Sequence, residues 1–296
     1  MARNTMPTPP RMPISRPPGG SRARGDIGVP EIPPRKPHPT APTNLSTTHS
    51  PIVRFVETEH RDWNGYTLIE GFPGTGLVGT ITAKYLVENL DFKEVGHLHS
   101  ELFLPIIRIH KGVPIFPSRL YVNDKRKLGV LISEQIIPKQ HIPRVATTIV
   151  EWILKNKIAR LISLAGLQTG VKNDLTVYAI AANEASKNMF KDLDVEIIDE
   201  GITTGITAIM LMHLKESNVK AFSMLGNVTI GADYKAAAEL IKRLNKLLDL
   251  DIKVEPLYEQ AKKTEKDIME QMKRLKEAQQ SDDGDDTRAR GPSYYA

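Results

Sequence analysis

The 296-residue chain contains no cysteine. This absence excludes disulfides, thiolate zinc sites and cysteine nucleophiles, so neither a disulfide-stapled secreted module nor a zinc finger is expected. The sequence also contains no run of about 18 apolar residues that would predict a membrane span. No apolar core follows the early arginines, as a secretory signal would require. These observations favour a cytoplasmic protein.

Positive charge is present but confined to one segment. The formal net charge is +5, and residues 1–50 alone hold seven basic and two acidic side chains. The rest of the chain therefore carries 33 basic and 33 acidic side chains. A neutral folded part gives no reason to expect a nucleic-acid partner.

The same first fifty residues hold twelve of the 21 prolines. Proline fixes φ and lacks an N–H, so residues 1–51 are predicted to form a disordered, extended basic arm. One alternative stays open: a basic arm can bind an acidic partner such as nucleic acid, with strong salt dependence.

Residues 52–255 alternate short apolar strands with amphipathic helical stretches, which is typical of an α/β domain. Strands are predicted at 66–70, 97–109, 113–122, 128–133, 159–165, 177–181, 195–198 and 219–225. Helices are predicted at 77–89, from Pro143 onward, between the strands at 177–181 and 195–198, and at 206–216 and 235–248. Lys111-Gly112 predicts a hairpin between the second and third strands.

The chain after Pro256 is helical in pattern and highly charged. Apolar positions at Ala261, Ile268, Met272 and Leu275 predict an amphipathic helix over residues 256–280. Such a helix can lie on its own domain or mediate self-association, and the pattern does not decide between them. Residues 281–296 begin with an acidic break and are predicted to form a flexible tail.

A glycine-rich turn follows the first predicted strand of the α/β segment. Gly74, Gly76 and Gly79 match the pattern G-x-G-x-x-G, in which glycines let a backbone approach a pyrophosphate at a helix N-terminus. However, Gly71-Phe72-Pro73 lengthens the turn, and no acid suited to a ribose closes the next strand. The turn is therefore interpreted first as close packing of a helix on its strand, with nucleotide or small-ligand binding by an enzyme as the alternative.

Further turns at residues 165–170, 199–205 and 226–228 follow strands, and in a parallel sheet they converge with the first at the carboxyl edge. Glu134, Asp199 and Asp233 are the acids that an enzyme using this edge would employ, with Glu200 beside Asp199. No G-x-S-x-G elbow accompanies them. The sequence predicts no catalytic residue and no cofactor.

His97, His99 and Glu101 alternate along a strand and would point to one face, as three metal ligands could. The rest of the sequence offers no obvious residues that would hold these three ligands in place. A half-exposed structural role is favoured, and no metal site is expected.

Tyr294, Tyr295 and Ala296 close the sequence. A tyrosine pair is a rigid anchor of low entropy cost, and a terminal carboxylate can pair with a lysine in a partner's pocket. Considered without any relative, a frayed end is the simpler interpretation.

Three separated blocks of the sequence belong together: Leu68–Gly79, the turn Ala165-Gly166-Leu167, and Glu200–Thr207. In this order they resemble the proteasome-assembly-chaperone family (PAC2-like), particularly its archaeal Pba-type members. The likeness covers roughly residues 60–260, and the arm lies outside the family pattern. It implies a three-layer α/β/α sandwich with a mostly parallel central sheet, similar to the nucleoside phosphorylases, and no established catalytic activity.

The resemblance also implies a function. Such chaperones end in a hydrophobic-tyrosine-any (HbYX) motif that enters pockets between α subunits of the 20S proteasome, and Tyr294, Tyr295 and Ala296 match that motif position by position. It implies a non-enzymatic, proteasome-binding homo-oligomer that acts as an assembly chaperone or an ATP-independent activator. With this resemblance, a docking role for the last three residues is favoured over a frayed end.

Overall fold

A large mixed β-sheet is the framework of the described part of the chain. The computed structural model describes residues 53–103, 105–171, 174–229, 231–267 and 270. Its strands are β1 (Val53–Glu57), β2 (Thr67–Gly71), β3 (Lys93–Ser100), β4 (Arg108–His110), β5 (Val113–Ile115), β6 (Ser118–Asn123), β7 (Leu128–Ser133), β8 (Arg160–Leu167), β9 (Val177–Ala181), β10 (Glu196–Ile197) and β11 (Lys220–Asn227). Its α-helices are α1 (Val78–Asn89), α2 (Ile142–Lys155), α3 (Glu184–Lys187), α4 (Ile206–Leu214) and α5 (Tyr234–Leu248). Short 3₁₀ turns cover Thr75–Leu77, Lys139–His141 and Asn188–Phe190.

The sheet has nine strands in the order β1-β3-β6-β7-β2-β8-β11-β9-β10. The four central strands β7, β2, β8 and β11 are parallel to one another. On either side of them the sheet turns antiparallel, through β6 and β3 to β1 and through β9. The predicted α/β class is confirmed, and its parallel part is the centre of the sheet.

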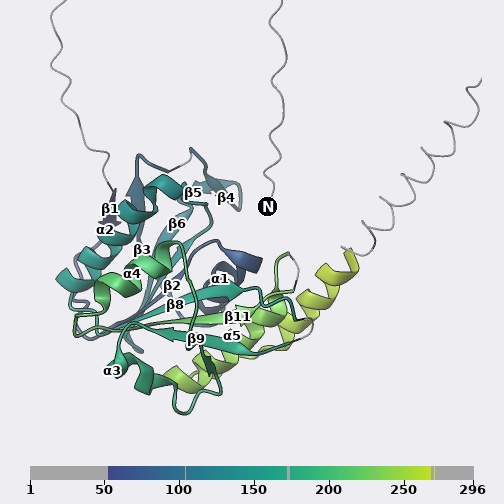
Figure 1. The fold of residues 1–296 in the computed structure, drawn as a ribbon. Coiled ribbons are helices and arrows are strands. Elements are labelled where there is room, and N and C mark those ends of the chain that lie inside the picture. Colours follow the sequence, from purple (N-terminus) through teal and green to yellow (C-terminus); the bar gives the residue numbers. More distant parts are fainter. Residues whose placement is uncertain (1–52, 104, 172–173, 230, 268–269, 271–296) are drawn as a thin grey trace, which may run out of the picture. The chain divides into compact units, whose positions relative to one another are not determined.

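Helices cover both faces of this sheet and give three layers (Figure 1). On one face α1 packs beside α5, over a core that includes Ile69, Ile162 and Phe222. On the other face α2 packs beside α4, over a core that includes Leu68, Leu131 and Leu161. Neighbouring residues of one strand, such as Leu68 and Ile69, thus enter different cores, which is why the central strands are apolar at nearly every position.

Helix α2 illustrates how the sequence directs this packing. Pro143 stands in its first turn, where a missing N–H costs nothing. The apolar positions of the helix recur at helical spacing and are buried against the sheet: Val145, Ile149, Trp152 and Ile153. The prediction for this segment is confirmed.

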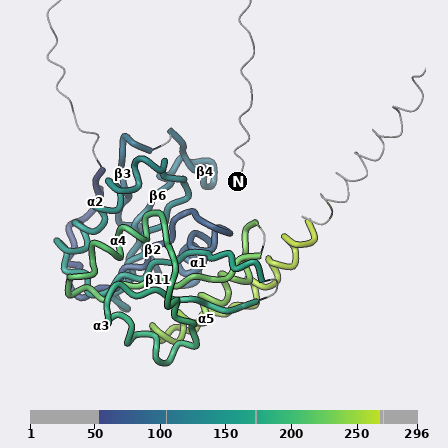
Figure 2. Tube along the Cα trace, in the orientation of Figure 1, coloured from purple at the N-terminus to yellow at the C-terminus, as the bar shows by residue number. Residues whose placement is uncertain are grey.

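The segment between residues 97 and 122 differs from the prediction. A single strand over 97–109 is wrong: β3 begins earlier, at Lys93, and ends at Ser100, and the chain resumes as strand only at β4. The strand predicted over 113–122 is likewise divided, at Phe116 and Pro117, into β5 and β6. The hairpin at Lys111-Gly112 is confirmed, because β4 and β5 pair as a separate two-stranded sheet. Figure 2 shows β4 at the periphery of the coloured part of the chain.

A further helix, residues 255–267, lies on the domain itself. Leu257 and Ala261 are buried, and Leu257 belongs to the core beneath α5. The Tyr258 hydroxyl donates to Glu239 of α5, and Lys235 of α5 lies 2.6 Å from Glu265. For this stretch the structure favours packing on its own domain over self-association; Ile268, Met272 and Leu275 lie outside the described residues.

The segments at the two ends of the sequence also lie outside the described residues. They include the predicted arm of residues 1–51 and the predicted tail of 281–296. The predicted division into arm, domain, helix and tail therefore stays a prediction.

Candidate functional site

A cavity of about 520 Å³ opens at the carboxyl ends of the central parallel strands. Three of the predicted turns line it: Gly74 and Thr75 after β2, Ala165 to Gln168 at the end of β8, and Ile202 to Gly205 before α4. The predicted convergence of these turns is confirmed. The fourth turn, Gly226–Val228, lies behind the first, with Val228 packed against Gly76.

The glycines of the G-x-G-x-x-G turn have different structural roles. A Cβ on Gly79 would lie 2.1 Å from the Leu164 carbonyl oxygen, so this glycine lets α1 pack directly on β8. Gly76 has φ +64° and abuts Val228. Gly74 is extended, borders the cavity and has nothing within 4 Å of an added Cβ. Close packing of a helix on its strand therefore accounts for Gly79 and Gly76. Of the three glycines, Gly74 is the one that lines the cavity.

The inner end of the cavity carries a buried acid that the sequence analysis does not single out. Glu70 on β2 is 1% exposed. Its carboxylate accepts a hydrogen bond of 2.5 Å from the Ser163 hydroxyl, and Ser163 lies 2.8 Å from the Thr207 hydroxyl. The Phe72 backbone N–H also donates to it. Burial raises the pKa of Glu70 to about 7, against the lowering effect of these hydrogen bonds.

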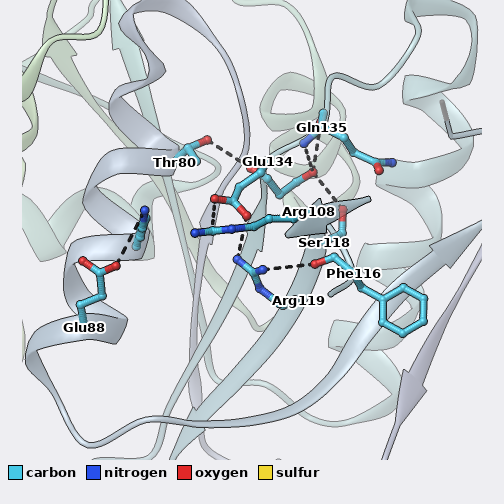
Figure 3. Close-up of polar contacts among 10 residues, drawn as sticks. Thr80, Glu88, Arg108, Phe116, Ser118, Arg119, Glu134 and Gln135 are labelled. Carbon is cyan, nitrogen blue, oxygen red and sulfur yellow. Dashed lines mark hydrogen bonds and ion pairs between the residues drawn. The ribbon is translucent and has the colours of Figure 1, made fainter. Parts of the chain in front are cut away.

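The acids named for an enzyme do not come together at this cavity. Glu134 lies between Arg108 and Arg119, the latter at 2.8 Å (Figure 3). Burial alone would raise the pKa of Glu134, but the two guanidinium groups outweigh it and hold that pKa below its usual value. Asp233 caps α5 by accepting from the Ala236 N–H at 2.9 Å, and Asp199 is exposed and does not line the cavity.

The histidine set also fails to assemble. His97 and His99 lie on β3 with ring centroids 6.4 Å apart, and the His97 ring stacks on Phe116 at 3.6 Å. Over the part of the chain that the structure describes, no three His, Asp or Glu side chains are grouped so as to hold a metal ion. The stacking on Phe116 gives His97 a packing contact on β3.

An apolar surface lies at the β4–β5 hairpin, and Gln135 lines both the hollow at this surface and the cavity. Its exposed side chains are Ile106, Ile107, Ile109, Val113 and Phe116, of which Ile107 is 69% exposed. Behind them is a second hollow of about 510 Å³ lined mostly by apolar groups. Exposed apolar side chains gathered in this way are typical of interaction sites.

Two further observations concern the ends of the chain and its helices. The docking residues Tyr294, Tyr295 and Ala296 lie outside the described residues. Among the helices that the structure describes, none has the length and hydropathy needed to cross a bilayer.

Comparisons with known proteins agree with this fold. An uncharacterized protein of Methanocaldococcus jannaschii is 31% identical over 221 residues, which is 74% of this chain and 90% of the relative. The crystal structure of Pyrococcus furiosus PbaA, described as an archaeal homologue of proteasome-assembly chaperone, matches with a TM-score of 0.69 and 30% identity, covering 78% of this chain and 96% of PbaA. Pyrococcus furiosus PbaB, described as an archaeal proteasome activator, matches with a TM-score of 0.64 and 25% identity over 74% of this chain and 98% of PbaB.

The resemblance seen in the sequence blocks thus extends to the whole domain, although the likeness to nucleoside phosphorylases stays a prediction. The model of the PAC2 family matches residues 68–272, from β2 through the helix that follows α5. With most of its length matched in this way, the chain belongs to the PAC2 family.

Proposed function

We propose that this protein is a non-enzymatic, proteasome-binding protein that acts as an assembly chaperone or as an ATP-independent activator. The observation that carries the proposal is the match to PbaA and PbaB, whose descriptions name proteasome assembly and proteasome activation. The partner is the α ring of the 20S proteasome, in the cytoplasm. The mixed roles of the glycines and the separation of the candidate acids support a binding rather than a catalytic role.

In this proposal the last three residues of the sequence form the anchor. Tyr294 supplies apolar contact, and Tyr295 packs its ring in a pocket between α subunits while its hydroxyl forms a hydrogen bond. The Ala296 carboxylate pairs with a lysine of the pocket. Residues 281–293 serve as a linker between the folded domain and the anchor.

The proposal includes self-association of the domain. The exposed apolar side chains at the β4–β5 hairpin, with Ile136 nearby at 69% exposure, offer a surface that a second copy of the chain can cover. Several tails on one assembly bind a ring of repeated pockets with avidity, because each later tail binds at a high effective concentration.

The test is a pull-down of 20S proteasome with the full chain and with a chain that ends at Ser293. We expect the shortened chain to lose binding and to keep its circular dichroism spectrum and unfolding midpoint. Tyr295→Ala should weaken binding strongly, whereas the matched change Ser293→Ala, outside the motif, should leave it unchanged. Equal binding by the full and shortened chains contradicts the docking tail.

A further inference from the structure

The cavity at the carboxyl edge contains polar groups that the proposed proteasome function does not use. Glu70, at 1% exposure, and Gln135, at 2%, both line it. Most of the remaining wall is apolar, with Phe72, Ile137 and Ile142 on the side of α2 and Leu164 and Leu225 from the sheet. A mainly apolar cavity with a few convergent polar groups is the usual form of a small-ligand site.

Within the described part of the chain, Glu70 is surrounded by hydrogen-bond donors and has no cation beside it. Ser163 donates to it at 2.5 Å, Thr207 can donate in turn to Ser163 at 2.8 Å, and the Phe72 N–H donates from the backbone. These three groups suit an ionised carboxylate. No basic side chain among the described residues contributes to its pKa, and burial raises that pKa to about 7. A buried carboxylate that is hydrogen-bonded and lacks a counter-charge is well matched to a bound cation.

Gln135 supplies a complementary group. Its backbone is held by Ser133, whose hydroxyl accepts from the Gln135 N–H at 3.3 Å and donates to the Gln135 carbonyl at 3.1 Å. Its side-chain Nε2, in contrast, is buried without a hydrogen-bond partner among the described residues. A buried N–H group left unpaired is unfavourable, so the Nε2 donor is available for an oxygen acceptor on a bound molecule.

The charges along the cavity wall would orient a cationic ligand. Of the described residues that line the cavity, Glu70 and Lys139 are the charged ones, and Lys139 is exposed whereas Glu70 is buried. An ammonium group is therefore attracted toward Glu70 and repelled from the Lys139 side. The other end of such a molecule, which carries the oxygen acceptor, then points away from Glu70.

We propose that this cavity binds a small aliphatic amine that also carries an oxygen acceptor, with the ammonium group on Glu70 and the oxygen on the Nε2 of Gln135. The hydroxyls of Ser163 and Thr207 hold the carboxylate for the ammonium group. The methylene chain between the two ends contacts the apolar wall.

Three probes of similar size separate the two contacts. 5-Aminopentanamide carries both groups, pentylamine lacks the acceptor, and hexanamide lacks the cation. Isothermal titration calorimetry with the full chain at pH 8 should show the first probe binding most tightly, pentylamine about tenfold or more weakly, and hexanamide not at all. Titration at pH 5 should weaken 5-aminopentanamide about a hundredfold, because the pH then lies two units below the pKa of the carboxyl.

Variants of Glu70 and Gln135 test the contact with the ammonium group and the contact with the oxygen acceptor separately. Glu70→Gln should abolish binding of both amines, and Gln135→Leu should make 5-aminopentanamide no better than pentylamine. Glu200→Gln, which removes an exposed acid next to the loop that lines the cavity, is the matched control and should change nothing. If Glu70→Gln fails to fold, the Gln135→Leu comparison and the pH dependence still decide.

Two results overturn the proposal: no binding of 5-aminopentanamide up to about 10 mM, or equal binding of all three probes. Binding that survives Glu70→Gln in a folded protein overturns it as well. Each of these readouts is independent of the proteasome, so a failure here leaves the docking tail untouched, and the reverse also holds.

Discussion

Glu70 is the residue at which the sheet departs most from an apolar interior. A carboxyl group buried in this way keeps its proton up to about pH 7, whereas in the unfolded chain it titrates near pH 4.5. Between these values the unfolded state has lost a proton that the folded state still holds. The free energy of unfolding therefore falls as the pH rises from about 4.5 to 7, by about 3 kcal/mol for this group, and levels off above that range.

The change Glu70→Gln removes this titration and should alter the pH dependence of stability. We expect the variant to gain stability relative to the parent chain, by about 3 kcal/mol, between pH 5 and pH 8. Urea unfolding at several pH values measures the difference.

Glu134 supplies a control of opposite sign. Its pKa is held below the usual value by Arg108 and Arg119, so its contribution to stability is present at neutral pH and disappears as the pH falls through that low pKa. Glu134→Gln should therefore be destabilising at pH 8 and less so in acid.

For Glu70→Gln, a plot of the free energy of unfolding against pH that runs parallel to that of the parent chain would contradict the burial of Glu70.

The importance of Glu70 could not be predicted from the sequence. A glutamate after Leu68 and Ile69 fits the solvated face of a half-exposed strand equally well. Only the covering of β2 on both faces buries it. Its hydrogen-bond partner Ser163 lies 93 residues further along the chain, and Thr207 lies another 44 residues beyond Ser163. The more conspicuous acids Glu134 and Asp233 turn out to be held by ion pairs and a helix cap.

At the scale of elements, the contact of α1 with β8 depends on Gly79. An added methyl group there would lie 2.1 Å from the Leu164 carbonyl oxygen, a distance that no rotamer relieves. Gly79→Ala should therefore destabilise the protein by about 1–3 kcal/mol or more, in spite of the higher helix propensity of alanine.

Gly74→Ala is the matched comparison within the same turn. Gly74 has φ −155° and open space around the position of a Cβ, so we expect a change within about 0.5 kcal/mol. Thermal unfolding of the two variants side by side measures both effects. Similar destabilisation by the two changes would mean that the turn, rather than the α1–β8 contact, requires glycine.

The elements that the sequence predicted well are those with a clear local signal, such as an apolar run or a proline in the first turn of a helix. Strand β8 is a largely apolar run, and α2 has a proline in its first turn and apolar residues at helical spacing. The sequence pattern does not indicate β1, and it does not separate β3 from β4. Strand β1 lies at the edge of the sheet and is only half-buried, so its residues carry little apolar periodicity to mark it.

At the scale of the molecule, the direction of the strands follows from the length of the connections. Only four residues join β6 to β7, and nine join β8 to β9. A parallel pair needs a crossover of about a dozen residues or more, so these short links produce antiparallel neighbours or strands that are not adjacent. The order of the strands, by contrast, depends on which helix covers which face, and no local pattern in the sequence specifies that.

The distribution of charge is the property of the whole molecule that most affects weak, non-specific binding. All of the net charge of +5 is accounted for by residues 1–50, and the rest of the chain is balanced. Polyanions bind mainly through neutralisation by lysine and arginine, with an affinity that falls steeply as salt increases. We therefore expect the full chain to be retained on a heparin column at low salt and a chain lacking residues 1–50 to pass through. Retention of the shortened chain would mean that the balanced charges of the domain are segregated into a basic face, and an acidic partner would then have to be sought on the domain instead of the arm.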